Sequence, residues 1–228
     1  MKSKILLLIT IVWSIPSMLM AQHEFVQDHR PHYLFGVPLH YNGFGGPLVS
    51  FSNMEGKFSI APGAMGGIII NNKFFISAYG QSVVTSHPRA DLIETSNLTT
   101  YSAVDANMWQ VGLWFGYIHK ADEVIHWGVS SMIARGQLFL MAKDPVTFQT
   151  RQIFNDRVYF ITPKIFVEMN MATWMKVNVS AGFRFTGKVN GQYLNRFNKL
   201  SPTFYKSDYD QPEFSLSLLF GGFRSKSD

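Results

Sequence analysis

The sequence predicts an all-β protein, an eight-stranded antiparallel up-and-down transmembrane β-barrel. Three observations lead to this prediction. Only 15% of the 228 residues are charged, where ordinary soluble domains have about 25%, and another 15% are aromatic. Several segments alternate apolar and polar residues with a period of two, the pattern of a strand with one apolar face. The long connections between these segments gather at one end of the sheet, as in membrane barrels with short periplasmic turns and long external loops.

The N-terminus has the features of a secretory signal. Lys2 and Lys4 precede an apolar run that ends at Met20, and the small residue Ala21 follows it. Pro16 interrupts the run, which is therefore shorter than the roughly 20 residues that a membrane helix needs. We expect export and this domain order: signal peptide 1–21, periplasmic N-terminal segment 22–42, barrel 43–223 and C-terminal tail 224–228.

Composition excludes several classes of function. Removing the leader with its two lysines lowers the formal net charge from +5 to +3, and the remaining basic residues are scattered, so no nucleic-acid partner is expected. The chain has no cysteine. A disulfide, a thiolate metal site, a cysteine nucleophile and a lipid on an N-terminal cysteine are therefore excluded. No cofactor is expected.

Eight segments are predicted as strands because turn residues bound each of them. They lie near Gly46–Asn53, Lys57–Ile70, Lys73–Val84, Asn107–His119, Ile125–Met141, Arg157–Asn170, Trp174–Thr186 and Glu213–Phe223. Counted along the chain, every long connection is odd-numbered, so all long loops leave the same end of an up-and-down sheet. A count of ten strands stays open if Tyr33–His40 and Asp91–Tyr101 also pair into the sheet.

The stretch Thr173–Gly187 shows the two faces of a strand most clearly. Its odd positions from 175 to 185 are all apolar, and its even positions include Lys176, Asn178 and Arg184. Alternation alone fits a soluble sandwich as well as a membrane barrel. Low charge, sorted loops and aromatic residues at strand ends, such as Trp109 and Tyr159, favour the barrel, because aromatics suit both interfaces of a membrane.

The polar faces are therefore predicted to point inward and to fill the lumen, leaving no open pore. This lumen polar network comprises Gln110, Lys164, Glu168, Lys176, Asn178 and Arg184. Opposite charges within it must pair, because isolated buried charge is costly. A three-residue turn at positions 171–173 would set Glu168 directly opposite Lys176. We predict that ion pair inside the barrel.

Two segments resemble known outer-membrane barrels. The ending FSLSLLFGGF, residues 214–223, resembles the C-terminal strand with a final aromatic that the barrel assembly machinery of Gram-negative bacteria reads. Residues 43–80, from GFGGPLVSF to FFISAYG, resemble the opening hairpins of small outer-membrane barrels of unknown function from Bacteroidota-type bacteria. The resemblance implies an outer-membrane location, with membrane lipid and the assembly machinery as partners. It brings no catalytic residues.

The expected role is structural or adhesive, through external loops that include residues 85–106 and 187–212. The last loop carries five aromatics among basic residues, namely Tyr193, Phe197, Phe204, Tyr205 and Tyr209. They would contact a glycan, lipopolysaccharide or a protein partner, since exposed aromatics anchor interfaces; alternatively, they extend the barrel wall.

Two other functions stay open. The first is a lipid A-modifying enzyme on the same barrel, which needs a serine or histidine dyad near the membrane boundary, and no His-x-Ser spacing supplies one. The second is a soluble lipocalin-like carrier of an apolar ligand, with the two faces inverted. A metal-binding arm at His23, His29, His32 and His40 is weighed against a plain polar extension, and no regular spacing fixes a ligand set there.

Overall fold

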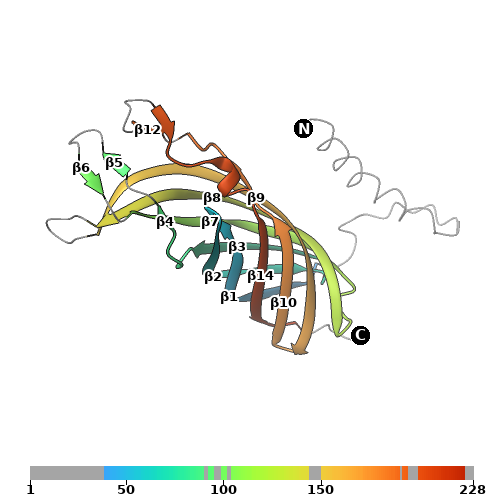
Figure 1. The fold of residues 1–228 in the computed structure, drawn as a ribbon. Coiled ribbons are helices and arrows are strands. Elements are labelled where there is room, and N and C mark those ends of the chain that lie inside the picture. The colour runs from blue at the N-terminus through green and yellow to red at the C-terminus, as the bar shows by residue number, and fades with distance from the viewer. Residues whose placement is uncertain are drawn as a thin grey trace, which may run out of the picture. The chain divides into compact units, whose positions relative to one another are not determined.

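The computed structural model describes residues 39–89, 92–94, 99–101, 104–143, 150–190, 192–194 and 200–223. Eight strand paths form the wall: β1 (Tyr41–Met54), β2 (Lys57–Ile70), β3 (Phe74–Ser82), β7 (Val104–His119), β8 (Ile125–Lys143), β9 (Thr150–Ala172), β10 (Met175–Phe183) continued by β11 (Phe185–Gly187), and β14 (Pro212–Gly221). Each pairs antiparallel with its neighbours, and β14 pairs with both β10 and β1, which closes the sheet (Figure 1). The predicted eight-stranded antiparallel barrel is confirmed.

The shorter elements lie in the connections. β4 (Pro88–Arg89) pairs with β7, β5 (Leu92–Glu94) pairs with β6 (Thr99–Tyr101), and β12 (Gln192–Leu194) pairs with β13 (Leu200–Pro202). A 3-10 turn, η1, spans Lys206–Asp208. Among the described residues, no helix is long and apolar enough to cross a membrane.

The alternative of ten wall strands is wrong for residues 91–101, because β5 and β6 form a separate two-stranded sheet. Of its other segment, residues 33–38 lie outside the described residues, as do the predicted signal peptide and most of the predicted periplasmic segment.

Two short turns at opposite ends of the barrel are type I′-like. Glu55 and Gly56 join β1 to β2 with φ of 52° and 75°, and Asn71 and Asn72 follow β2 with φ of 50° and 53°. Such turns match the twist of a hairpin, and glycine and asparagine tolerate the positive φ that they require. The first turn places Glu55 at the end of the barrel from which the long connections leave.

Some strands are longer than predicted. β1 begins at Tyr41 instead of near Gly46, and β9 begins at Thr150 instead of near Arg157. β9 pairs with β8 from Thr150 opposite Lys143 to Met169 opposite Ile125, with one register shift between Leu140 and Met141. In residues 150–157 of β9 only Ile153 and Phe154 are apolar, and they are neighbours, so period-two alternation does not mark this part of the strand in the sequence.

The outward face of the wall is apolar. Exposed side chains alternate with buried ones along β7, β9 and β14; the exposed set on these strands includes Val111, Leu113, Phe115, Ile161, Ile165, Val167, Phe214 and Leu216. On β7 the outward row runs from Trp109 to His119, ten residue steps of about 3.4 Å. At a strand tilt of about 40° this row covers about 26 Å along the barrel axis, close to the roughly 25 Å apolar band of a membrane barrel.

The inward face has two different halves. β9, β10 and β14 contribute buried polar and charged residues, whereas the wall from β1 to β8 contributes many large apolar ones, including Phe44, Leu48, Met65, Phe75, Trp114, Met132 and Leu138. The predicted packed polar lumen is therefore corrected in one respect: polar residues fill one part of it and large apolar residues the rest. In a narrow barrel the side chains must fill the interior at close packing, and any polar group among them must be paired. Methionine, leucine and tryptophan meet the first condition as well as serine does.

Candidate functional site

A three-residue ion cluster lies inside the polar half of the barrel, within β9, β10–β11 and β14. Glu213 bridges two cations: Lys164 Nζ lies 2.7 Å from Oε1, and Arg184 Nη1 lies 3.2 Å from Oε2. All three side chains are at most 1% exposed. Such burial costs several kcal/mol per charge unless the groups pair, so the fold depends on this geometry.

Neighbouring polar groups complete the cluster. Lys164 Nζ also donates to Ser215 Oγ at 2.5 Å, and Ser180 and Ser215 share a hydrogen bond of 3.1 Å. Arg184 Nε donates to the carbonyl of Tyr209 at 3.0 Å, and the backbone N–H of Arg184 donates to the carbonyl of Gln211. The N–H of Arg184 thus continues the register in which Phe183 faces Pro212. On the other side, β10 and β11 face β9 in one unbroken register, in which Pro163, a residue without an N–H, lies opposite Phe183 at the break.

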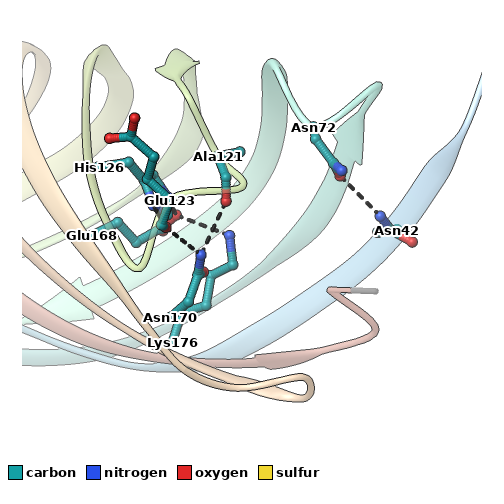
Figure 2. Close-up of polar contacts among 8 residues, drawn as sticks. All are labelled: Asn42, Asn72, Ala121, Glu123, His126, Glu168, Asn170 and Lys176. Carbon is teal, nitrogen blue, oxygen red and sulfur yellow. Dashed lines mark hydrogen bonds and ion pairs between the residues drawn. The ribbon is translucent and has the colours of Figure 1, made fainter. Parts of the chain in front are cut away.

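A second cluster lies near the short-turn end and comprises His126, Glu168 and Lys176 (Figure 2). Glu168 Oε2 lies 2.8 Å from His126 Nε2 and 3.3 Å from Lys176 Nζ. His126 Nδ1 lies 3.0 Å from the carbonyl oxygen of Glu123. Each ring nitrogen of His126 thus lies within hydrogen-bond distance of an oxygen, and the tautomer sets which nitrogen donates.

The turn between β7 and β8 is held by Asn170, which lies two residues after Glu168 on β9. Asn170 Nδ2 donates to the carbonyls of Ala121 and Glu123, at 3.0 and 2.7 Å (Figure 2). Beside it lies a cavity of about 230 Å³, lined by Asn72, Ala121, Asp122, Asn170, Ala172, Thr173, Lys176 and Phe223. Lys176 Nζ lies 4.8 Å from the centre of the Phe223 ring, so this ammonium is held between a carboxylate and an aromatic face.

The six predicted lumen residues are all buried, with at most 5% exposure. The predicted pair of Glu168 and Lys176 is confirmed, but the predicted register is wrong. The turn has two residues, Thr173 and Trp174, and a bulge follows Met175, so Glu168 faces Asn178 across the ladder. The bulge returns even-numbered residues to the inward face, and Lys176 reaches Glu168 diagonally.

The structure does not unite the six residues in one network. Lys164 and Arg184 belong to the first cluster, and Glu168 and Lys176 belong to the second. Asn178 faces Glu168 across the ladder, and Gln110 lies on β7, which pairs with none of β9, β10 and β14. Sequence reasoning missed His126 and Glu213 as their partners. Glu213 has a usable signal, because it shares the parity of Ser215 and Ser217, which are inward and polar.

A third group of contacts, which we call the loop clasp, joins Glu55, Arg89, Phe204 and Tyr209 at the long-loop end. Arg89 Nε lies 3.1 Å from Glu55 Oε2, and Tyr209 Oη donates to Glu55 Oε1 at 2.8 Å. The Arg89 guanidinium carbon lies 5.8 Å from the centre of the Phe204 ring. Burial raises the pKa of the Glu55 carboxyl above its ordinary value, and the charge of Arg89 opposes that rise.

The loop clasp changes the interpretation of the aromatic loop. Phe204 and Tyr209 are 2% and 0% exposed and pack edge to face at 5.9 Å, so neither ring is available to a partner. Tyr205 is 50% exposed. Tyr193 lies in the β12 strand, and Phe197 lies outside the described residues.

The described residues do not bring together the groups that the enzyme hypothesis requires. Within them, no serine hydroxyl hydrogen-bonds to a histidine ring: Ser86 Oγ donates to Asp105 Oδ1 at 2.6 Å, and the His87 ring contacts the carbonyl of Thr85. No group of three or more histidine, aspartate or glutamate residues in this part of the chain could hold a metal. His40 is described, but His23, His29 and His32 lie outside the described residues.

Comparison with known proteins gives likenesses of fold. No protein-family model and no curated protein sequence matches the chain. Solved structures similar to it include Ail, the attachment invasion locus protein of Yersinia pestis (9% identity, 79% of this chain and 97% of that one, TM-score 0.43). Another is Neisserial surface protein A (8% identity, 82% of this chain and 100% of that one, TM-score 0.46). A third is the N-terminal β-barrel domain of Pseudomonas aeruginosa OprF (9% identity, 78% of this chain and 96% of that one, TM-score 0.42). Identities and TM-scores this low say nothing about function.

Proposed function

We propose that this protein is an outer-membrane β-barrel with a filled lumen and a structural or adhesive role, exercised by the loops at its outer end. The observation that carries the proposal is the distribution of polarity across the wall. Apolar side chains cover the outside, and paired charges lie inside. A closed barrel satisfies its backbone internally, so a bilayer is the solvent that suits this outer face.

The loop clasp supports a role for the outer end. It joins three separate connections between wall strands: the turn after β1, segment 83–89 and segment 203–211. Loops tied in this way form a pre-organised surface, and a rigid surface loses less entropy on binding than a mobile one does. The partner would be a glycan, lipopolysaccharide or another protein. Tyr205 is an exposed aromatic on this surface.

The filled lumen favours this role over transport. Trp114, Arg184, Phe160 and Met132 are each at most 1% exposed and occupy the interior. The lipocalin-like alternative would require a polar exterior, whereas the exterior observed is apolar. Membership of the Bacteroidota barrel family, recognition by the assembly machinery and export by the predicted leader belong to the same proposal.

The location has a direct test. Membrane fractionation of expressing Gram-negative cells should place the chain in the outer-membrane fraction, and a gel should show faster migration of unheated than of boiled protein. A chain found only in the soluble fraction would refute the membrane proposal.

The role at the outer end needs a second test. Cells that display the wild-type barrel should adhere to immobilised glycan or lipopolysaccharide. Cells with residues 192–202 replaced by a short glycine linker should lose adhesion while the barrel stays heat-modifiable. Equal adhesion of both strains to every surface would contradict a role for this hairpin, and lipid A mass spectra that change with expression would favour the enzyme instead.

A further inference from the structure

A basic patch lies on the outward face of β8, β9 and the residue after β11. Tyr159 is 42% exposed and lies between two cations, with Arg135 Cζ at 6.0 Å and Lys188 Nζ at 5.1 Å from its ring centre. Arg135 pairs with Tyr159 across the ladder, and Gly187, just before Lys188, pairs with Tyr159 on the other side. Arg157 is exposed two residues from Tyr159 on the same face.

The charges of this patch are not neutralised within the described part of the chain. Arg135, Arg157 and Lys188 form no ion pair there, although each of the two buried lumen clusters pairs its cations. The nearest carboxylate in sequence, Asp156, alternates to the other face of β9 and accepts a hydrogen bond from the backbone of Asn190 at 2.6 Å. Three clustered cations that pair with no carboxylate among the described residues favour an anionic ligand.

The position of the patch selects the kind of anion. The ladder row directly below it, toward the short-turn end, is wholly apolar and consists of Leu113, Ile133, Ile161 and Phe185. Trp109, whose indole donates to Gln137 at 3.2 Å, lies in the row above, and tryptophan and tyrosine mark membrane interfaces. The patch therefore lies where lipid headgroups meet the wall, and arginine is well shaped to bind phosphate there.

A groove further down the same face suits the tail of such a lipid. It has a volume of about 400 Å³ and is lined by Phe74, Phe75, Phe115, Gly116, Tyr117, Val129, Ser130 and Ser131. Ser131 is a small outward residue between Val129 and Ile133 on β8. It lies four residues from Arg135, or about 14 Å along the strand. One leaflet of hydrocarbon is about 15 Å deep, so a tail anchored at the patch reaches the groove.

We propose that this face binds an anionic, phosphate-bearing membrane lipid, with the headgroup phosphate held by Arg135, Lys188 and Arg157 and an acyl chain in the groove beside Phe115 and Ser131. The proposal rests on the membrane location proposed above. Neither the headgroup site nor the groove involves the loop clasp or the lumen clusters.

The test measures lipid retained by the folded barrel in neutral detergent micelles, using native mass spectrometry. The probes are dimyristoyl phosphatidic acid, dimyristoyl phosphatidylcholine and inorganic phosphate. Wild-type protein should retain phosphatidic acid over phosphatidylcholine, and inorganic phosphate should not displace it. The double variant R135Q/K188Q should bind phosphatidic acid at least about tenfold more weakly, because charge-assisted hydrogen bonds are lost.

Two control variants make the result specific. K73Q/R151Q removes the same charge from exposed positions outside the patch and should retain the lipid like the wild type. Ser131→Phe fills the groove, and it should weaken binding of the dimyristoyl lipid but not of a dihexanoyl analogue. Every variant should stay heat-modifiable, so a failure of lipid binding is distinguishable from a failure of the barrel. Undiminished binding by R135Q/K188Q, an equal loss in K73Q/R151Q, or displacement by inorganic phosphate would overturn the proposal.

Discussion

Replacement of Glu213 by glutamine tests whether the lumen is filled and dry. The change keeps the size of the side chain and removes the charge that Lys164 and Arg184 share, at 2.7 and 3.2 Å. What remains for the two cations is Ser215 Oγ and the carbonyl of Tyr209. Removing one partner of a fully buried pair costs about 3–5 kcal/mol, so the free energy of unfolding should fall by about that amount.

The measurement is urea unfolding of the barrel in lipid vesicles, followed by tryptophan fluorescence. Glu123→Gln is the matched control, because it breaks an ion pair with Lys120 whose side chains are 55% and 61% exposed, and it should leave the unfolding midpoint unchanged. Adding Lys164→Met to Glu213→Gln should restore part of the loss, since it removes one of the two uncompensated cations. A loss below about 1 kcal/mol for Glu213→Gln, the usual value of a solvated pair, would refute the dry lumen.

Three further predictions concern the loops and the wall. Arg89→Gln should loosen the loop clasp and speed trypsin cleavage after Lys206 severalfold in folded protein, while the barrel stays heat-modifiable; an unchanged cleavage rate would contradict the clasp. Burial holds the pKa of His87 below its ordinary value, so the fold prefers the neutral ring. The unfolded chain therefore binds the extra proton as pH falls through about 6.5, and stability is lost in that direction. His87→Phe should show a smaller drop in urea midpoint between pH 8 and pH 5 than the wild type, and an equal drop would count against the assignment. A Cβ on Gly112 would lie 2.1 Å from a backbone oxygen of β8, whereas one on Gly66 would have its nearest atom at 3.6 Å. Gly112→Ala should thus reduce the yield of heat-modifiable barrel, and Gly66→Ala should not.

The strands that span the apolar band were predictable because period-two alternation is strong there. The strand Lys57–Ile70 is observed as predicted, and the faces of Val111, Leu113 and Phe115 on β7 are outward as alternation requires. The extension of β9 back to Thr150 was not predictable in this way, because period-two alternation does not mark residues 150–157. The structure supplies the reason: β8 continues beside it and pairs with it.

The candidate site was predictable only in part. Burial of Lys176 and Glu168 follows from their shared parity, and their pairing follows from adjacent strands. The partners His126 and Glu213 come from strands whose register no local pattern reveals. The loop clasp is even harder to predict from the sequence, since Glu55 and Tyr209 are separated by 154 residues and meet only after the barrel has closed. Closure also explains why Phe204, one of the aromatics for which contact with a partner or extension of the wall was predicted, packs against Tyr209.

The location of Glu213 on β14 has a consequence for the order of assembly. Lys164 and Arg184 precede it in the chain, on β9 and at the end of β10, and their carboxylate arrives only with the last strand. His126, Glu168 and Lys176 come from three successive strands and can meet within a hairpin array. One end of the lumen can therefore be neutralised early, whereas the middle keeps two uncompensated cations until β14 docks between β10 and β1. Closure of the barrel and neutralisation of the two buried cations are then a single event. A chain whose barrel has not closed keeps uncompensated charges and is poorly suited to remain in hydrocarbon.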